Sequence, residues 1–503
     1  MKRRFFTSFI FGTVLVALAT ASQPNILLIT VDDMNFDTPG CFGGPDGITP
    51  NIDKLAEQGM RFEKAHITLA ICQASRQVLM TGRFPHNAGY RWFEPVADGV
   101  PILPEILHEQ GYMNACFGKA EHLEPRSRYQ WEMSRDIEEI KFGREPAEYG
   151  RLCREFIKRA DTVGKPFFLM ANSHDPHRPF HGGSDEENVL AWAKSQGGIM
   201  STPSRVYTPD EAMELGFLPD IPEVRKQTAQ YMSSSRRADD TVGEILRALE
   251  ETGHENDTLV VFLSDNGSPF PFAKGNCYLN STRTPFIVRW TGKVKPGTES
   301  RDAYINGIDF MPTILEALGI PIPEGTDGRS YLSLIEGKTQ TDRDSLVTVF
   351  YNVYPVAGGK KPELTTWYEI RAIHKGDYAY IYNGWAQGER WFGPLGTPEI
   401  LNEMNETGHE GRVEFFRKRS IEELYDFEAD PDGLHNLAEL PVYQPLIREM
   451  REDLLQWMRD NKDSDLLPEY EILVRNDGIT TDFPFGKGYL FDKGLNAHSS
   501  DRK

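Results

Sequence analysis

The chain has 503 residues, 39% of them hydrophobic, so it is long enough for two or three domains with packed cores. Its formal net charge is −20, and this excess of acidic residues argues against general nucleic-acid binding. An anionic substrate would need a local cluster of cations that outweighs the field of the whole chain.

The first 21 residues have the pattern of an export signal. A basic start, Lys2 to Arg4, precedes a mostly apolar run from Phe5 to Leu18, and Ala19-Thr20-Ala21 is a small-residue cleavage site. The apolar run is shorter than the roughly 20 residues that a membrane-spanning helix needs. We therefore expect a cleaved signal peptide, a periplasmic or secreted product, and no membrane association after cleavage.

Nearly continuous apolar runs predict strands that are buried on both faces of a parallel sheet. The runs are Asn25 to Val31, Pro166 to Ala171, Thr258 to Leu263 and Phe286 to Trp290. Helices are expected between them, from Thr49-Pro50-Asn51 to Gly59, over 101–111 and over 223–252. Strands that alternate with helices predict an α/β fold.

Polar residues follow three of these runs. Asp32-Asp33, His174 and Asp265-Asn266 each stand at the predicted carboxyl end of a strand, where open α/β sheets bind ligands. Oxygen ligands suit hard cations such as calcium or magnesium. Either acidic pair alone would more often be a loop or capping element, but both at strand ends favour a metal site.

The pattern changes after about residue 345. Short alternating runs at 348–351, 368–374 and 378–382 predict an antiparallel sheet, and 446–461 predicts a helix. We therefore expect three parts, namely a signal peptide at 1–21, a large N-terminal catalytic domain at 22–345 and a smaller α+β subdomain at 346–503.

Five cysteines leave at least one unpaired or modified in an exported chain. The four others, Cys41, Cys116, Cys153 and Cys277, could pair in three ways or stay free. Cys72 stands at a predicted helix start, and that helix would end at Gly82. Helix starts attract anions, and Arg76 could add a two-pronged contact to an oxyanion.

The segment from Cys72 to Arg83 resembles the signature of the sulfatase family. That signature reads C-x-P-S-R with a downstream T-G-R, and Ala74 stands here where proline is usual. Other family motifs follow in order along nearly the whole chain. They are Asn25 to Asp33, Thr49 to Asp53, Gly118 to His122, His174 to His177, Ser264 to Gly267, Lys274 to Tyr278, Glu423 to Asp426 and Asn436-Leu437.

This resemblance implies an alkaline-phosphatase-like fold, in which helices sandwich a mixed, mostly parallel sheet. It also implies that a formylglycine-generating enzyme oxidises Cys72 to formylglycine. One calcium ion is then expected, bound by carboxylate and amide oxygens and by the modified cysteine. The implied ligands are Asp32, Asp33, Cys72, Asp265 and Asn266.

The resemblance also implies roles for the remaining site residues. One hydroxyl of the hydrated formylglycine attacks sulfur, and the second allows sulfate to leave. Arg76 and Lys119 would position this diol, and His122 would be the base for sulfate release. His174 and Lys274 would hold the sulfate and assist the leaving oxygen.

Within the family the chain is most similar to N-sulfoglucosamine sulfohydrolases, through His174 to Arg178 and Asp265 to Pro271. Those enzymes have arginine where Lys274 stands here, and lysine is usual where O-linked esters are cut. We therefore expect a sulfatase acting on a sulfated saccharide, with sulfamidase activity as the alternative. Two further readings stay open, a phosphatase or phosphonate hydrolase of the same superfamily and an inactive sugar-binding protein with unmodified Cys72.

Overall fold

A computed structural model describes residues 23–184, 186–195, 200–351, 369–386 and 398–478. The expected signal peptide, residues 1–21, lies outside these residues. Among the described residues, every helix is too short or too polar to cross a lipid bilayer. All five cysteines are described, and all are free thiols.

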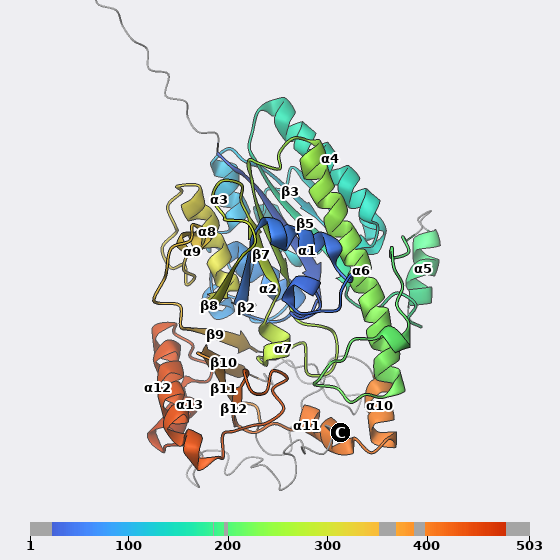
Figure 1. Ribbon diagram of the computed structural model, residues 1–503. Coiled ribbons are helices and arrows are strands. Elements are labelled where there is room, and N and C mark those ends of the chain that lie inside the picture. Colours follow the sequence, from blue (N-terminus) through green and yellow to red (C-terminus); the bar gives the residue numbers. More distant parts are fainter. Residues whose placement is uncertain (1–22, 185, 196–199, 352–368, 387–397, 479–503) are drawn as a thin grey trace, which may run out of the picture.

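An eight-stranded sheet forms the larger part of the molecule, with strand order β4-β3-β5-β1-β6-β7-β2-β8 (Figure 1). All pairings are parallel except those of β7 with its two neighbours. In chain order the strands are β1 (Asn25–Asp32), β2 (Met60–His66), β3 (Met113–Phe117), β4 (Met133–Arg135), β5 (Phe167–Pro176), β6 (Thr258–Ser264), β7 (Phe286–Arg289) and β8 (Thr298–Asn306). The expected mixed, mostly parallel sheet is confirmed.

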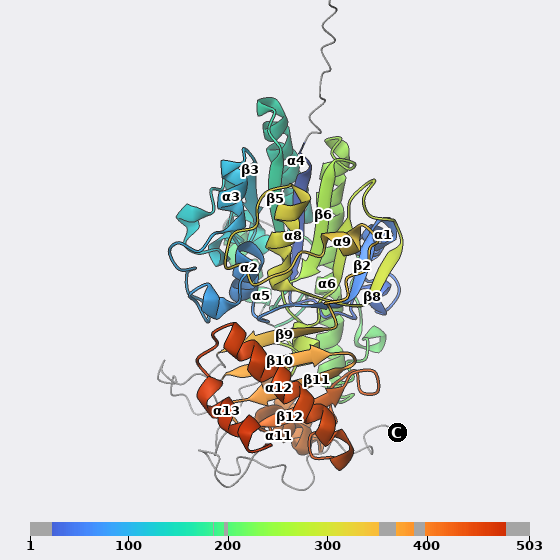
Figure 2. The ribbon, with the colours of Figure 1, turned by 90° about the vertical axis from the view of Figure 1, so that its left-hand side faces the viewer.

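Helices cover both faces of this sheet. Alternate residues of β1 point to opposite faces, so Leu27 and Ile29 pack in one core and Ile26 and Leu28 in the other. On the Leu27 face lie α1 (Pro50–Gln58), α4 (Pro146–Val163) and α6 (Pro222–Glu251). On the opposite face lie α2 (Cys72–Thr81), α3 (Leu103–Glu109) and α8 (Phe310–Ala317), as Figure 2 shows.

A second, four-stranded antiparallel sheet lies below the first in both views, with order β12-β11-β10-β9. It consists of β9 (Ser345–Phe350), β10 (Ile370–Lys375), β11 (Tyr378–Asn383) and β12 (Glu422–Asp426). The sheets are joined at β9, where the amide of Val349 donates to the carbonyl of Thr68 at 2.9 Å. The expected smaller α+β part with an antiparallel sheet is thus present.

The remaining helices are short or flank the second sheet. The long α12 (Gln444–Asp460) buries Ile447, Met450 and Leu454 against that sheet. The others are α5 (Glu186–Ser195), α7 (Leu279–Thr282), α9 (Leu332–Ile335), α10 (Pro398–Glu406), α11 (Glu410–Arg417) and α13 (Leu467–Arg475).

Candidate active site

The two acidic pairs meet at the carboxyl ends of β1 and β6. These strands are neighbours, so Asp33 and Asp265 lie side by side although 232 residues separate them. The amide of Asp33 donates to Oδ1 of Asp265 at 3.1 Å, and Nδ2 of Asn266 donates to Oδ1 of Asp33 at 2.6 Å. Asp32, Asp33, Asp265 and Asn266 are all fully buried.

Three cations balance these three carboxylates. Nζ of Lys119 lies 2.6 Å from Oδ2 of Asp32, and Nη2 of Arg76 lies 2.7 Å from Oδ2 of Asp265. The ammonium group of Lys274 pairs with Oδ1 of Asp33. A buried carboxylate is costly unless it is paired, so this balance allows the acidic cluster to exist inside the protein.

The pKa values of the carboxyl groups reflect two opposing effects, burial and the neighbouring cations. Burial raises the pKa of Asp33 to about 6 and that of Asp265 to about 7, despite their cationic partners. Burial also opposes ionisation of Asp32, but the nearby charges, Lys119 foremost, hold its pKa well below the ordinary value. A further cation at this site would favour the ionised form of all three groups.

Cys72 is the first residue of α2 and is buried beside this cluster. The preceding residue, Ile71, is extended, and the helix ends at Gly82 in the left-handed conformation, as expected. Burial, reinforced by the Asp32 carboxylate, raises the pKa of the Cys72 thiol to about 12. The unmodified side chain is therefore a protonated thiol at neutral pH and a poor nucleophile.

Three histidines lie on the other side of the cluster. His174 lies within β5, with Nδ1 3.9 Å from Oδ2 of Asp32. His177 stacks on His174 at a ring-centroid distance of 4.8 Å and places Nε2 3.8 Å from Oδ2 of Asp33. His122 follows Lys119 on a short 3-10 helix, Ala120–His122.

Burial keeps these histidines neutral. It lowers the pKa of His122 to about 2 and that of His177 to about 3, and it holds the pKa of His174 well below its ordinary value. Nδ1 of His122 and Nδ1 of His174 have no hydrogen-bond partner among the described residues. Neither nitrogen is therefore committed to another described group of the protein.

His177 was not among the predicted catalytic residues. It stands three positions after His174 in the motif from His174 to His177, and from the sequence it was assigned no role of its own. Its side chain is 32% exposed, against 5% for His174, so it faces the open side of the site.

Several buried oxygens fit a metal ion. Oδ1 of Asp32, Oδ2 of Asp33 and Oδ1 of Asn266 have no hydrogen-bond partner among the described residues. Carboxylate and amide oxygens are the ligands that calcium and magnesium prefer. The one group of three metal-ligating side chains among the described residues is Asp32, Asp33 and His177, whose ligand atoms lie within 4.8 Å of one another.

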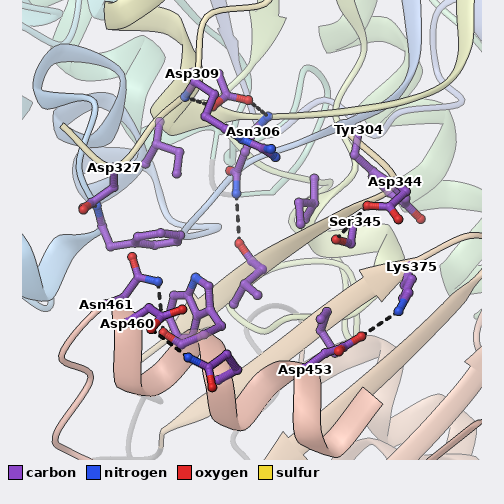
Figure 3. Close-up of a pocket in the computed structure, with 18 residues that line it drawn as sticks. Tyr304, Asn306, Asp309, Asp327, Asp344, Ser345, Lys375, Asp453, Asp460 and Asn461 are labelled. Atoms are coloured by element: carbon purple, nitrogen blue, oxygen red, sulfur yellow. Dashed lines mark hydrogen bonds and ion pairs between the residues drawn. The ribbon is translucent and has the colours of Figure 1, made fainter. Parts of the chain in front are cut away.

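A cavity lies away from this cluster, between the two sheets (Figure 3). Its volume is about 500 Å³, and its walls come from the β8 region on one side and from α12 on the other. Labelled residues of its lining are Asn306, Asp309, Asp327, Asp453 and Asp460. None of the predicted site residues lines it, so its size does not make it the active site.

Comparisons with known proteins agree with the geometry. A family model described as Sulfatase matches residues 24–320, and one described as N-sulphoglucosamine sulphohydrolase, C-terminal, matches residues 270–372. Human N-sulphoglucosamine sulphohydrolase is 28% identical over 480 residues, which cover 90% of this chain and 93% of the human protein. An ulvan-active sulfatase of Formosa agariphila is also 28% identical, covering 94% of this chain and 86% of that protein.

Solved structures share the fold at lower identity. BT4656 in complex with D-glucosamine-2-N,6-O-disulfate has a TM-score of 0.63 at 19% identity, covering 88% of this chain and 99% of that one. The phosphonate monoester hydrolase of Agrobacterium radiobacter has a TM-score of 0.62 at 18% identity, covering 87% and 96%. Such likenesses concern the fold alone, and they confirm the expected alkaline-phosphatase-like architecture.

Proposed function

The chain belongs to the sulfatase family, and we propose that it releases inorganic sulfate from a sulfated saccharide with a formylglycine made from Cys72 and one calcium ion. The family and the named relatives make it a hydrolase of sulfate esters or sulfamates. The observation that carries the finer proposal is the meeting of Cys72 with three carboxylates and three cations at one edge of the sheet.

A saccharide substrate is supported by the relatives. They include a sulphohydrolase of N-sulphoglucosamine, ulvan-active sulfatases and an N-acetylglucosamine-6-O-sulfatase of Bacteroides thetaiotaomicron. A sulfate ester is our first expectation, because an ammonium group, Lys274, stands at the site. Cleavage of a sulfamate on N-sulfoglucosamine is the alternative, which the similarity of residues 270–372 to the sulphohydrolase C-terminal model supports.

Calcium would be held by Asp32, Asp33, Asp265 and Asn266, together with the oxidised side chain of Cys72. Bound there, it would offset negative charge on the transferring sulfate. Buried oxygens without hydrogen-bond partners support this assignment. The short contact of Lys274 with Asp33 supports it as well, since the carboxylate already attracts a cation.

The inert thiol of Cys72 supports oxidation to formylglycine. A protonated, buried thiol with a pKa of about 12 is not an activated nucleophile. The hydrated aldehyde of formylglycine supplies two hydroxyls, one to attack sulfur and one whose deprotonation expels sulfate. This requires a formylglycine-generating enzyme as a partner during maturation.

The chain's own residues then divide the remaining work. Arg76 and Lys119 hold the nucleophile in place and offset its charge, because both are buried and paired with the acidic cluster. His122 would accept the proton that triggers sulfate release, a role supported by its Nδ1, which has no hydrogen-bond partner among the described residues. His174 and Lys274 contact the sulfate and support the departing oxygen, and His177 is positioned to contact the saccharide from the open side.

Sulfate release from D-glucosamine-2-N,6-O-disulfate tests the proposal. Glucosamine 6-sulfate as product indicates a sulfamidase, and glucosamine N-sulfate indicates an ester sulfatase. Cys72→Ala should abolish release, whereas Cys153→Ala, at another buried cysteine that lies in α4, should retain it. The wild-type peptide that contains residue 72 should have the mass of formylglycine.

Activity, metal and mass measurements on the same purified protein also test the two alternative functions. A phosphatase or phosphonate hydrolase would release phosphate or phosphonate in preference to sulfate and would contain zinc or manganese in place of calcium. An inactive sugar-binding protein would keep the plain cysteine mass when produced in a host with the modifying enzyme. Export through residues 1–21 and the division at residues 345 and 346 remain parts of the proposal, testable by N-terminal sequencing and limited proteolysis.

A further inference from the structure

Asp175 stands between two histidines of the active site but points away from it. Its neighbours in the motif, His174 and His177, face Asp32 and Asp33. The Asp175 carboxylate is instead fully buried between two arginines, Arg144 and Arg237.

Both arginines donate hydrogen bonds to the segment from Asp175 to His177. Nε of Arg237 donates to Oδ2 of Asp175 at 2.6 Å, and its Nη2 donates to Oδ1 at 3.1 Å. Nε of Arg144 donates to Oδ1 of Asp175 at 3.1 Å, and its Nη2 donates to the carbonyl of His177 at 2.7 Å. Arg144 therefore ties the Asp175 side chain to the backbone of His177.

The two arginines come from different parts of the chain. Arg237 lies within the long helix α6, and Arg144 lies in the link between the 3-10 helix Glu138–Gly143 and α4. Nη1 of Arg237 also lies 3.5 Å from Oε1 of the buried Glu186 at the start of α5. Two buried cations thus meet two buried anions.

Such a cluster is a poor source of stability. The cost of removing four charges from water about equals or exceeds their attraction, and apolar residues of the same volume often stabilise a protein more. A function in orientation explains it better, because the donors fix both the side chain and the backbone of the segment that carries the two histidines.

We propose that Arg144 and Arg237, acting through Asp175, are positioning residues that hold His174 and His177 against the active site. This inference rests on the proposed sulfatase function. It predicts that loss of the arginine contacts to Asp175 and His177 lowers the rate of the chemical step, because a displacement of about 1 Å at a reacting group can reduce the rate about 10²-fold.

A second buried arginine provides a matched control. Arg371 of β10 is as buried as Arg144, pairs with the buried Asp463 at 2.8 Å and donates to the carbonyl of Ile370 at 3.0 Å. It lies in the second sheet, and its contacts include none of the site residues. Arg144→Lys and Arg371→Lys both keep the charge and lose the forked geometry.

Sulfate release from D-glucosamine-2-N,6-O-disulfate is measured for the full chain and both variants, at a temperature well below each Tm. We expect kcat of Arg144→Lys to fall about 10- to 100-fold, in line with loss of transition-state contacts. We expect Arg371→Lys to keep kcat within about twofold for a similar loss of Tm. Equal kcat values in the two variants would overturn the inference. If Arg144→Lys does not fold, Arg237→Lys takes its place with the same expectation.

Hydrogen exchange provides a readout that needs no substrate. Peptides covering residues 172–178 should exchange faster in Arg144→Lys than in wild type and should be unchanged in Arg371→Lys. Unchanged exchange in both variants overturns the positioning role. An inactive wild-type protein overturns the proposed function instead, so the two failures are distinguishable.

Discussion

Replacing His374 by phenylalanine should make the protein less sensitive to acid. His374 of β10 lies at the junction of the two sheets, with its ring 4.4 Å from that of His66 at the end of β2. Both side chains are buried, and Nδ1 of His374 has no hydrogen-bond partner among the described residues. Burial lowers the pKa of His374 to about 3, and burial foremost holds that of His66 well below its ordinary value.

The magnitude follows from proton linkage. A histidine in the unfolded chain has a pKa of about 6.5, so between about pH 6.5 and pH 3 the unfolded state binds a proton that folded His374 rejects. Neutral His374 therefore does not reduce the free energy of unfolding above about pH 6.5. Below that value the free energy of unfolding declines as the pH falls from about 6.5 to about 3. At pH 5 this one residue should cost about 2 kcal/mol relative to pH 8.

Urea unfolding at pH 8 and pH 5 measures the effect. Between these two pH values, His374→Phe should lose about 2 kcal/mol less unfolding free energy than wild type. Phenylalanine keeps a flat ring against Phe427, which stacks on His374 at 6.2 Å. The same change at the exposed His108 serves as the control, against which the pH dependence of His374→Phe is compared. A pH dependence identical in His374→Phe and wild type would refute this reasoning.

Two further predictions concern the site. Calcium should stabilise the folded protein by about 2.7 kcal/mol at a hundredfold excess over Kd, and a chelator should reverse this. Scanning calorimetry should show the corresponding rise in Tm for wild type and no such rise for Asp33→Ala. A rise with zinc but none with calcium would contradict the assignment. In urea unfolding, the free energy of unfolding of Gly118→Ala should fall below that of Gly111→Ala by more than about 1 kcal/mol. Both glycines have positive φ, but only at residue 118 would a Cβ lie 2.2 Å from the carbonyl oxygen of Asn172. Equal losses would mean that the close approach is unimportant.

Much of the fold could be predicted because apolar runs reveal burial. The runs of β1 and β6 are nearly continuously apolar and buried throughout, and the helical period of Val242, Ile245 and Leu249 marks α6. The run of β7 predicted a buried strand, but its antiparallel direction depends on the path of the preceding residues, which periodicity does not encode. β8 was not predicted because most of its residues are polar and only its last three are buried.

The site was only partly predictable for a related reason. Asp32-Asp33 and Asp265-Asn266 follow recognisable strands, so their convergence could be expected from topology. Arg144 and Arg237 follow no such signal, since an isolated arginine is most often at the surface. Their contact with Asp175, across 31 and 62 residues of chain, exists only in the tertiary structure.

If Cys72 is oxidised as proposed, the packing of α2 limits when this can happen. All ten residues from Cys72 to Thr81 are buried, so a modifying enzyme that has to bind this stretch of chain, and not only the side chain of residue 72, would find it covered once the helix has docked. Under the proposed function, oxidation would therefore precede the docking of α2. Under the same proposal, protein that folds with an intact Cys72 thiol should stay inactive, and we expect the modifying enzyme to restore activity only after that protein has been unfolded.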